Sequence, residues 1–161
     1  MTPERLKELV SYDPESGVFT RLKITRGAHV VCGNLRLDGY VSLYLDGKAR
    51  SAHRMAWLYV YGSLPETALD HMNGVRHDNR ICNLRPATGS QNLQNLGGPY
   101  KNNKNSGLLG VYKFFDEGKW QARIQIDGKS KSLGLYKTKE DAFAAYKAAK
   151  AEVHPFCVRP I

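Results

Sequence analysis

The chain has 161 residues, 42% of them hydrophobic, which suits one medium domain or two small ones. No apolar run approaches the roughly 20 residues that a membrane-spanning helix needs, so the sequence excludes such a helix. The formal net charge of +9 favours a polyanionic partner such as nucleic acid.

The N-terminal residues and the cysteines predict a cytoplasmic protein. Residues 1–9 carry acidic side chains and lack an apolar signal core, so we expect no secretion. The three cysteines, Cys32, Cys82 and Cys157, are scattered and include no Cys-x-x-Cys pair. We therefore expect reduced thiols, with neither a disulfide framework nor a thiolate zinc site.

Short elements fill the first part of the chain. In order, we expect a helix over residues 2–10 capped by Thr2, a turn at 13–17, a strand from 18–20, a hairpin over 39–52 and a buried helix over 53–61. The hairpin follows from period-two alternation over residues 39–45, which ends in the strong turn sequence Asp46-Gly47.

A second group of elements follows residues 97–105, whose glycines and asparagines have the composition of a linker. The expected elements are strands over 111–115, 120–126 and 130–136, a turn at Asp127-Gly128, and a helix over 141–153 that begins with a capping-box-like sequence at Thr138. The pattern predicts an α+β protein with two domains, residues 1–96 and 106–161.

The polar segment over residues 69–96 holds the residues best suited to chemistry. Asp70 and His71 are adjacent, Asn83 follows twelve residues after His71, and Asn92 follows nine residues later. If the segment folds as strand, loop, strand and helix, then Asp70, His71 and Asn92 can converge. A carboxylate and an amide oxygen are hard ligands that suit Mg²⁺ or Mn²⁺, and a neutral imidazole can deprotonate water.

In this order and spacing, residues 39–96 resemble the HNH nuclease family, specifically its phage and intron-associated homing endonucleases. The resemblance implies a ββα-metal fold with its core at about residues 66–96. It further implies that His71 is the general base and that Asp70 and Asn92 hold the divalent metal, Mg²⁺ or Mn²⁺. Asn83 would brace the His71 imidazole through its side-chain carbonyl. The third motif residue is often His, and Asn92 makes zinc or nickel a poorer fit.

Alternatives stay open around this motif. Asn79 would replace Asn83 as the brace if the register differs. His53 would either contact phosphate or pack as a half-buried residue. Three arginines flank the site and would either clamp phosphates or belong to a solvated loop: Arg76, Arg80 and Arg85.

Residues 104–154 resemble a second family, the APETALA-two/ethylene-response-factor DNA-binding domain. The matching elements are Gly-Val-Tyr at 110–112, Trp-x-Ala-Arg-Ile at 120–124, Leu-Gly-x-Tyr at 133–136 and Ala-Ala-Tyr at 144–146. The resemblance implies three antiparallel strands packed on one helix, with the exposed face of the sheet in the DNA major groove. We interpret His154, beyond the helix, as a surface residue.

Alternation over residues 120–126 agrees with such a sheet. If Ala122, Ile124 and Ile126 face the helix, Arg123 and Gln125 face outwards, where they would read guanine and adenine. The predicted DNA contacts of this domain are Tyr112, Lys113, Trp120, Arg123, Gln125, Lys129 and Lys131. Trp120 would alternatively pack in the core. Residues 97–161 carry 12 Lys and Arg against 6 Asp and Glu, compared with 12 against 9 in residues 1–96.

Together these patterns predict a metal-dependent DNA endonuclease of the homing type, which hydrolyses phosphodiester bonds and is positioned on double-stranded DNA by its C-terminal domain. A single site cuts one strand per engagement, so we expect a monomer that nicks DNA or cuts two strands in succession. We expect no small-molecule substrate and no membrane partner, and a location in the bacterial cytoplasm if a phage encodes the chain. The alternative is a DNA-binding regulator that no longer cleaves. An RNA-binding protein is disfavoured because the sequence lacks an aromatic platform signature.

Overall fold

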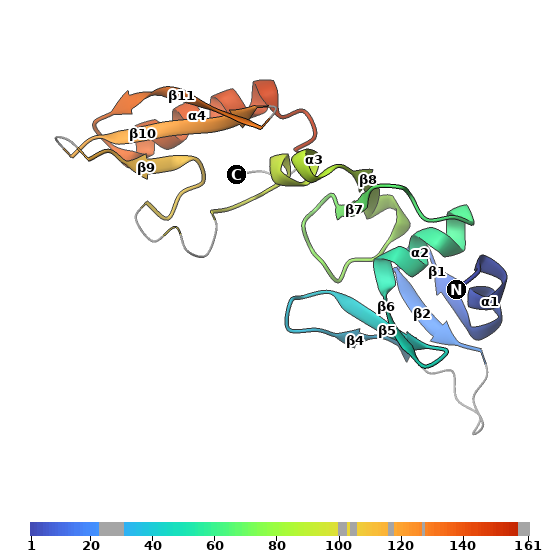
Figure 1. The fold of residues 1–161 in the computed structure, drawn as a ribbon. Coiled ribbons are helices and arrows are strands. Elements are labelled where there is room, and N and C mark those ends of the chain that lie inside the picture. The colour runs from blue at the N-terminus through green and yellow to red at the C-terminus, as the bar shows by residue number, and fades with distance from the viewer. Residues whose placement is uncertain (23–30, 100–102, 104–105, 116–117, 127, 158–161) are drawn as a thin grey trace. The chain divides into compact units, whose positions relative to one another are not determined.

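The computed structural model describes residues 1–22, 31–99, 103, 106–115, 118–126 and 128–157 (Figure 1). Helices and small antiparallel sheets form two compact units, Met1–Thr88 and Gly89–Ile161. The division falls eight residues before the end of the first domain that the sequence predicts. Of the predicted linker, residues 100–102, 104 and 105 lie outside the described residues.

The first unit begins with α1 (Pro3–Leu9), whose N-cap Thr2 accepts a hydrogen bond from the backbone nitrogen of Arg5 at 3.2 Å. The prediction of helix at Val10 is wrong, since this residue begins β1 (Val10–Asp13). Val10 is β-branched and fully buried, and pairing it with Arg21 of β2 (Val18–Arg21) satisfies its backbone in the sheet. β3 (Val31–Cys32) completes this sheet in the order β1-β2-β3.

A second sheet is formed by β4 (Asn34–Leu35), β5 (Val41–Leu45) and β6 (Lys48–Ser51). The predicted turn is confirmed, because Asp46 and Gly47 both have positive φ angles, of 48° and 73°. The buried helix α2 (Ala52–Tyr61) follows directly and ends at Gly62. The core between these elements includes Leu6, Val10, Phe19, Leu43, Leu45, Met55 and Leu58.

The motif segment folds as a hairpin around a long loop. β7 (Ala68–His71) pairs with β8 (Leu84–Ala87), and a single 3-10 turn, η1 (Ile81–Asn83), leads into β8. The register sets Asp70 opposite Arg85 and His71 opposite Leu84. Strand, loop and strand are therefore present as predicted, and the acidic residue and the histidine lie at the end of β7.

The second unit contains α3 (Gly89–Gln94), β9 (Val111–Lys113), β10 (Trp120–Ile126), β11 (Lys129–Tyr136) and α4 (Lys139–Val153). The three strands form one antiparallel sheet in the order β11-β10-β9, and α4 packs on it. Thr138 caps α4 by accepting a hydrogen bond from the Asp141 backbone nitrogen at 3.1 Å. Asp127, in the predicted turn, lies outside the described residues.

In the part of the chain that the structure describes, none of the helices has the length and apolar character needed to cross a membrane.

Candidate active site

The end of β7 brings an acidic and a basic group into a largely buried position. Asp70 is 9% exposed and His71 is 4% exposed. Both lie on the hairpin strand that pairs with β8, so backbone hydrogen bonds on that side fix their positions. Burial of two polar side chains next to each other is costly unless each is hydrogen-bonded, so their partners define the site.

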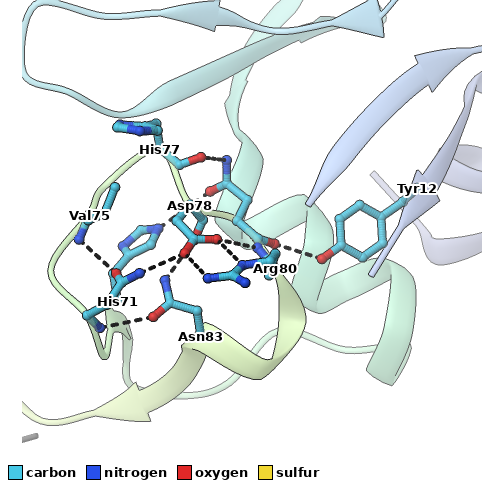
Figure 2. A network of polar contacts seen from close by, with 9 residues as sticks. Tyr12, His71, Val75, His77, Asp78, Arg80 and Asn83 are labelled. Carbon is cyan, nitrogen blue, oxygen red and sulfur yellow. Dashed lines mark hydrogen bonds and ion pairs between the residues drawn. The ribbon is translucent and has the colours of Figure 1, made fainter. Parts of the chain in front are cut away.

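Asn83 closes the loop between the two strands (Figure 2). Its side-chain oxygen Oδ1 accepts a hydrogen bond from the backbone nitrogen of Asn73 at 3.0 Å, and its Nδ2 donates to the backbone oxygen of Asp78 at 2.8 Å. The backbone of Asn83 also accepts a hydrogen bond from the Met72 nitrogen at 2.9 Å. One buried amide therefore ties the loop at Asn73 and at Asp78 to the turn that precedes β8.

Asn79 makes the contact to the His71 ring. The distance from His71 Nε2 to Asn79 Oδ1 is 3.4 Å. Asn79 donates from Nδ2 to the backbone oxygen of His77 at 3.2 Å, and this bond fixes which end of the amide faces the ring. The contact with the imidazole that the HNH resemblance implied for Asn83 is made by Asn79, the residue left open as the alternative.

The amide orientation decides which ring nitrogen of His71 carries the proton. A carbonyl oxygen can only accept, so Nε2 must donate, and the neutral ring then keeps its lone pair on Nδ1. Burial lowers the pKa of His71 below its usual value, while the contact with Asn79 and the charge of Asp70 act in the opposite direction. The neutral form of the ring, which can accept a proton, is therefore favoured near neutral pH.

Two further rings surround His71. The His53 ring lies edge-on to it, with centroids 5.2 Å apart, and the Tyr40 ring lies 5.7 Å from His71 and 5.4 Å from His53. Burial, followed by the charge of His71, lowers the pKa of His53 to about 4. His53 is half-buried and neutral in this position, which matches the packing role that the sequence left open.

Each of the three flanking arginines has a partner within the protein. Arg85 donates from Nε and from a terminal nitrogen to Asp70 Oδ2, at 3.2 and 3.0 Å. Arg80 pairs with both carboxylate oxygens of Asp78, at 2.8 and 2.7 Å. Arg76 lies over the Tyr40 ring, 5.1 Å from its centroid, and donates to the backbone oxygen of Asp38 at 2.8 Å. Arg76 and Arg80 are also exposed, whereas Arg85 is partly buried.

Asn92 lies in the middle of α3 and is partly exposed. By the pattern of contacts α3 belongs to the second unit, whereas Asp70 and His71 belong to the first. Within the described ranges, no group of three or more His, Cys, Asp or Glu residues is placed to hold a metal ion. A metal site made of Asp70 and Asn92 contains only one residue of these four types, so it would not form such a group.

Residues 50–94 match a family model described as HNH endonuclease. We refer to residues 50–94 as the HNH segment. It contains Asp70, His71, Asn79, Asn83 and Asn92, and it begins before His53. The HNH segment ends at Gln94, so residues 95–161 lie outside the match.

A solved structure described as "DNA binding and cleavage by the HNH homing endonuclease I-HmuI" is similar to part of this chain. The identity is 24%, the TM-score is 0.41, and the similarity covers 54% of this chain and 51% of that chain. The chain thus spans about half the length of that solved chain. None of the curated proteins matches.

The outward face of the second sheet carries a connected row of polar side chains. Arg123 donates from Nε to Gln121 Oε1 at 2.7 Å, and its guanidinium lies 5.8 Å from the centroid of the Tyr112 ring. Gln121 in turn donates to Ser132 Oγ at 3.0 Å. Ala122 and Ile124 are buried against α4, so the alternation expected along β10 is confirmed.

The other residues predicted to contact DNA divide into two groups. Those that are exposed on the second unit are Tyr112, Lys113, Gln125, Lys129 and Lys131. Trp120 is partly buried and packs against the core. The interpretation of His154 as a surface residue is wrong, since it is 7% exposed and its Nε2 lies 2.7 Å from the backbone oxygen of Gln125. The ring covers the end of β10 beyond the point where β9 stops.

Proposed function

We propose that this chain is a metal-dependent DNA endonuclease of the homing type, which hydrolyses phosphodiester bonds. The observation that carries the proposal is the environment of His71, inside the HNH segment. The ring is buried, its Nε2 lies 3.4 Å from the Asn79 Oδ1 acceptor, and burial lowers its pKa, so the neutral ring would donate from Nε2 and carry its lone pair on Nδ1. This is the form that a general base requires.

In the proposed reaction, Nδ1 of His71 accepts a proton from a water molecule. The water oxygen forms a new bond to the scissile phosphorus, and the bond from phosphorus to the 3′ oxygen breaks, so that the 3′ oxygen leaves with the bonding electron pair and takes a proton from solvent. Asn79 holds the Nε2–H side of the ring, so that the proton arriving at Nδ1 produces an imidazolium whose second N–H is already hydrogen-bonded. Asn83 keeps the loop closed during this step.

A divalent metal fits the residues of the proposed site. Mg²⁺ typically binds through one or two protein oxygens and otherwise keeps water or substrate oxygens as ligands. Asp70 would supply a carboxylate oxygen and Asn92 an amide oxygen. When bound, the metal supplies Lewis-acid stabilisation of the phosphorane charge and of the departing oxygen. The assignment of Asp70 and Asn92 rests on the order and spacing of the motif.

The second unit is proposed to position the nuclease on double-stranded DNA, as an APETALA-two-type domain would. Its sheet exposes Arg123 and Gln125, which suit direct contacts to bases in the major groove. Lys113, Lys129 and Lys131 are exposed and suit phosphate contacts. A monomer with one such site is expected to nick DNA or to cut two strands in succession.

The proposal is tested by incubating the purified protein with supercoiled plasmid in Mg²⁺ and in excess EDTA. Cleavage is expected only with the metal, while binding in a gel-shift experiment persists in EDTA. His71→Ala should slow cleavage by about 10²–10⁴-fold, the usual contribution of a positioned general base. Its DNA affinity should change little, because phosphate contacts dominate binding.

His77→Ala is the matched control, since the His77 side chain is exposed and only its backbone oxygen serves Asn79. Cleavage in excess EDTA would reject the metal-dependent mechanism. DNA binding without cleavage under every metal condition would support the alternative, a regulator that no longer cleaves.

A further inference from the structure

The hairpin formed by β1 and β2 lies outside the HNH segment in sequence, yet it packs directly on the loop that carries Asn79. Three contacts join them, and they come from Tyr12, Pro14 and Gly17. Each contact falls on residues 79–81, the part of the loop between the His71 partner and β8. The hairpin therefore touches the backbone at the point from which the Asn79 side chain reaches His71.

Tyr12 makes the most buried of these contacts. Its hydroxyl donates to the backbone oxygen of Asn79 at 2.7 Å, and Figure 2 shows it reaching the loop from the side opposite His71. The ring is held by Phe19 and Tyr59, with centroids 4.6 and 5.7 Å away. Burial raises the pKa of Tyr12 well above its usual value, so the phenol stays protonated and remains a donor.

The turn of the hairpin supplies the other two contacts. The backbone nitrogen of Ile81 donates to the backbone oxygen of Pro14 at 3.1 Å. A Cβ added to Gly17 would lie 2.5 Å from the backbone nitrogen of Arg80 and 2.7 Å from the backbone carbon of Asn79. Distances this short require the backbone to shift, so glycine is needed at position 17 for the turn and the loop to approach so closely.

We propose that the β1–β2 hairpin is a positioning element for the general base. Tyr12 and Gly17 fix the backbone of Asn79, the Asn79 side chain fixes the proton of His71 on Nε2, and Nδ1 is thereby kept as the accepting nitrogen. Tyr12 and Gly17 are positioning residues that act through Asn79. The inference rests on the proposed function of His71, and it adds residues from outside the HNH segment to that function.

The first test compares Gly17→Ala with Gly47→Ala in the full chain. Both glycines have a φ angle of +73°, so both variants carry a similar backbone strain. A Cβ at position 47 meets nothing within 4 Å, whereas a Cβ at position 17 presses on the backbone of Asn79 and Arg80. Cleavage at saturating DNA and Mg²⁺ should fall by about 10- to 100-fold in Gly17→Ala, because a small misplacement of a reacting group has this effect. Gly47→Ala should stay within about twofold of the wild type.

The second test removes one hydrogen bond without removing a ring. Tyr12→Phe is compared with Tyr44→Phe, whose side chain is exposed. The readouts are the single-turnover cleavage rate, the DNA dissociation constant and the ¹⁵N NMR shifts of the His71 ring, which report the tautomer without any cleavage. Tyr12→Phe should slow cleavage by about tenfold, leave DNA affinity unchanged and increase the population of the Nδ1–H tautomer.

The tautomer measurement separates this inference from the proposed function. If the wild-type protein never cleaves DNA, the proposed nuclease function is wrong. A tautomer shift in Tyr12→Phe would still establish that Tyr12 positions the His71 ring. The inference is overturned if Tyr12→Phe and Gly17→Ala cleave as fast as their controls, or if the His71 tautomer is the same in Tyr12→Phe and wild type. If Gly17→Ala fails to fold, Tyr12→Phe alone tests the inference, because this variant keeps the ring and its packing.

Discussion

At the scale of single residues, the histidines of the described chain differ in function because their surroundings differ. His71 is buried beside Asp70 and Asn79, His53 packs edge-on to it, and His77 is exposed on the same loop. Burial lowers the pKa of both His71 and His53, since a charged ring loses its hydration. The same residue type therefore provides a proposed base, a packing partner and a solvated side chain within one small unit.

His53 makes the stability of the protein depend on pH. Its pKa is about 4 in the folded protein, against about 6.5 in an unfolded chain, so the unfolded state takes up a proton first as the pH falls. The stability that this neutral ring contributes is fully present above pH 6.5 and is lost as the pH falls towards 4. The loss should amount to as much as about 3 kcal/mol in the free energy of unfolding.

The measurement is urea unfolding at several values between pH 4 and 7. His53→Gln should reduce the dependence, because one of the two histidines with a lowered pKa is gone, whereas His77→Gln should leave it unchanged. Equal slopes in His53→Gln and wild type would show that the acid sensitivity has another source.

At the scale of elements, alternation along β10 places core residues on one face of the strand and polar residues on the other. Ala122 and Ile124 face α4 and form the core, while Arg123 and Gln125 face away from it. A strand of this kind can vary its outward residues for recognition while its inward residues keep the sheet folded. Arg123 is held by Gln121 and lies over Tyr112, so its guanidinium is partly oriented before any ligand arrives.

This arrangement predicts different outcomes for two basic residues of the same sheet. Arg123→Ala should weaken binding to the preferred sequence by about 1–3 kcal/mol if the side chain makes a bidentate guanine contact, and should relax selectivity. Lys129→Ala should weaken binding about equally on all sequences, because a phosphate contact carries no sequence information. Affinities for a duplex with a mapped cut site and for a scrambled duplex test this. Identical losses on both duplexes in Arg123→Ala would contradict base readout.

At the scale of the whole molecule, the chain divides into two compact units between Thr88 and Gly89. α3 belongs to the second unit, and the Lys150 ammonium, 2% exposed, donates to the backbone oxygen of Leu96 at 2.5 Å. Residues that the sequence places at the end of the nuclease domain are thus tied to α4. Asn92 lies on this short helix, so the proposed metal ligand and the proposed general base lie in different compact units.

A fragment of residues 1–96 tests whether the second unit positions the nuclease on DNA. It lacks 12 of the 24 lysines and arginines, and with them the exposed face of the C-terminal sheet. DNA affinity should fall, and its dependence on salt should flatten, because fewer counterions are released on binding. Residual nicking at high protein concentration should be less selective for sequence. A fragment that binds its target with the affinity, salt dependence and selectivity of the full chain would show that the second unit does not position the nuclease.

The sequence by itself determined the elements whose signals are local. Asp46-Gly47 specifies a tight turn, Thr138 caps α4, and the alternation along β10 separates its two faces, because each of these depends on residues a few positions apart. The spacing of Asp70, His71 and Asn83 likewise predicted the HNH segment before any fold was known. Such patterns set backbone preferences and identify which face is apolar.

Only the tertiary structure decided which side chains meet. Asn79 rather than Asn83 contacts the His71 ring, because the loop closes on Asn83 and turns Asn79 inwards. His154 is buried because it covers the open end of β10. The hydroxyl of Tyr12 reaches the backbone of Asn79 across 67 positions of sequence. Contacts of this range depend on how separate elements pack, and neither periodicity nor turn chemistry carries that information.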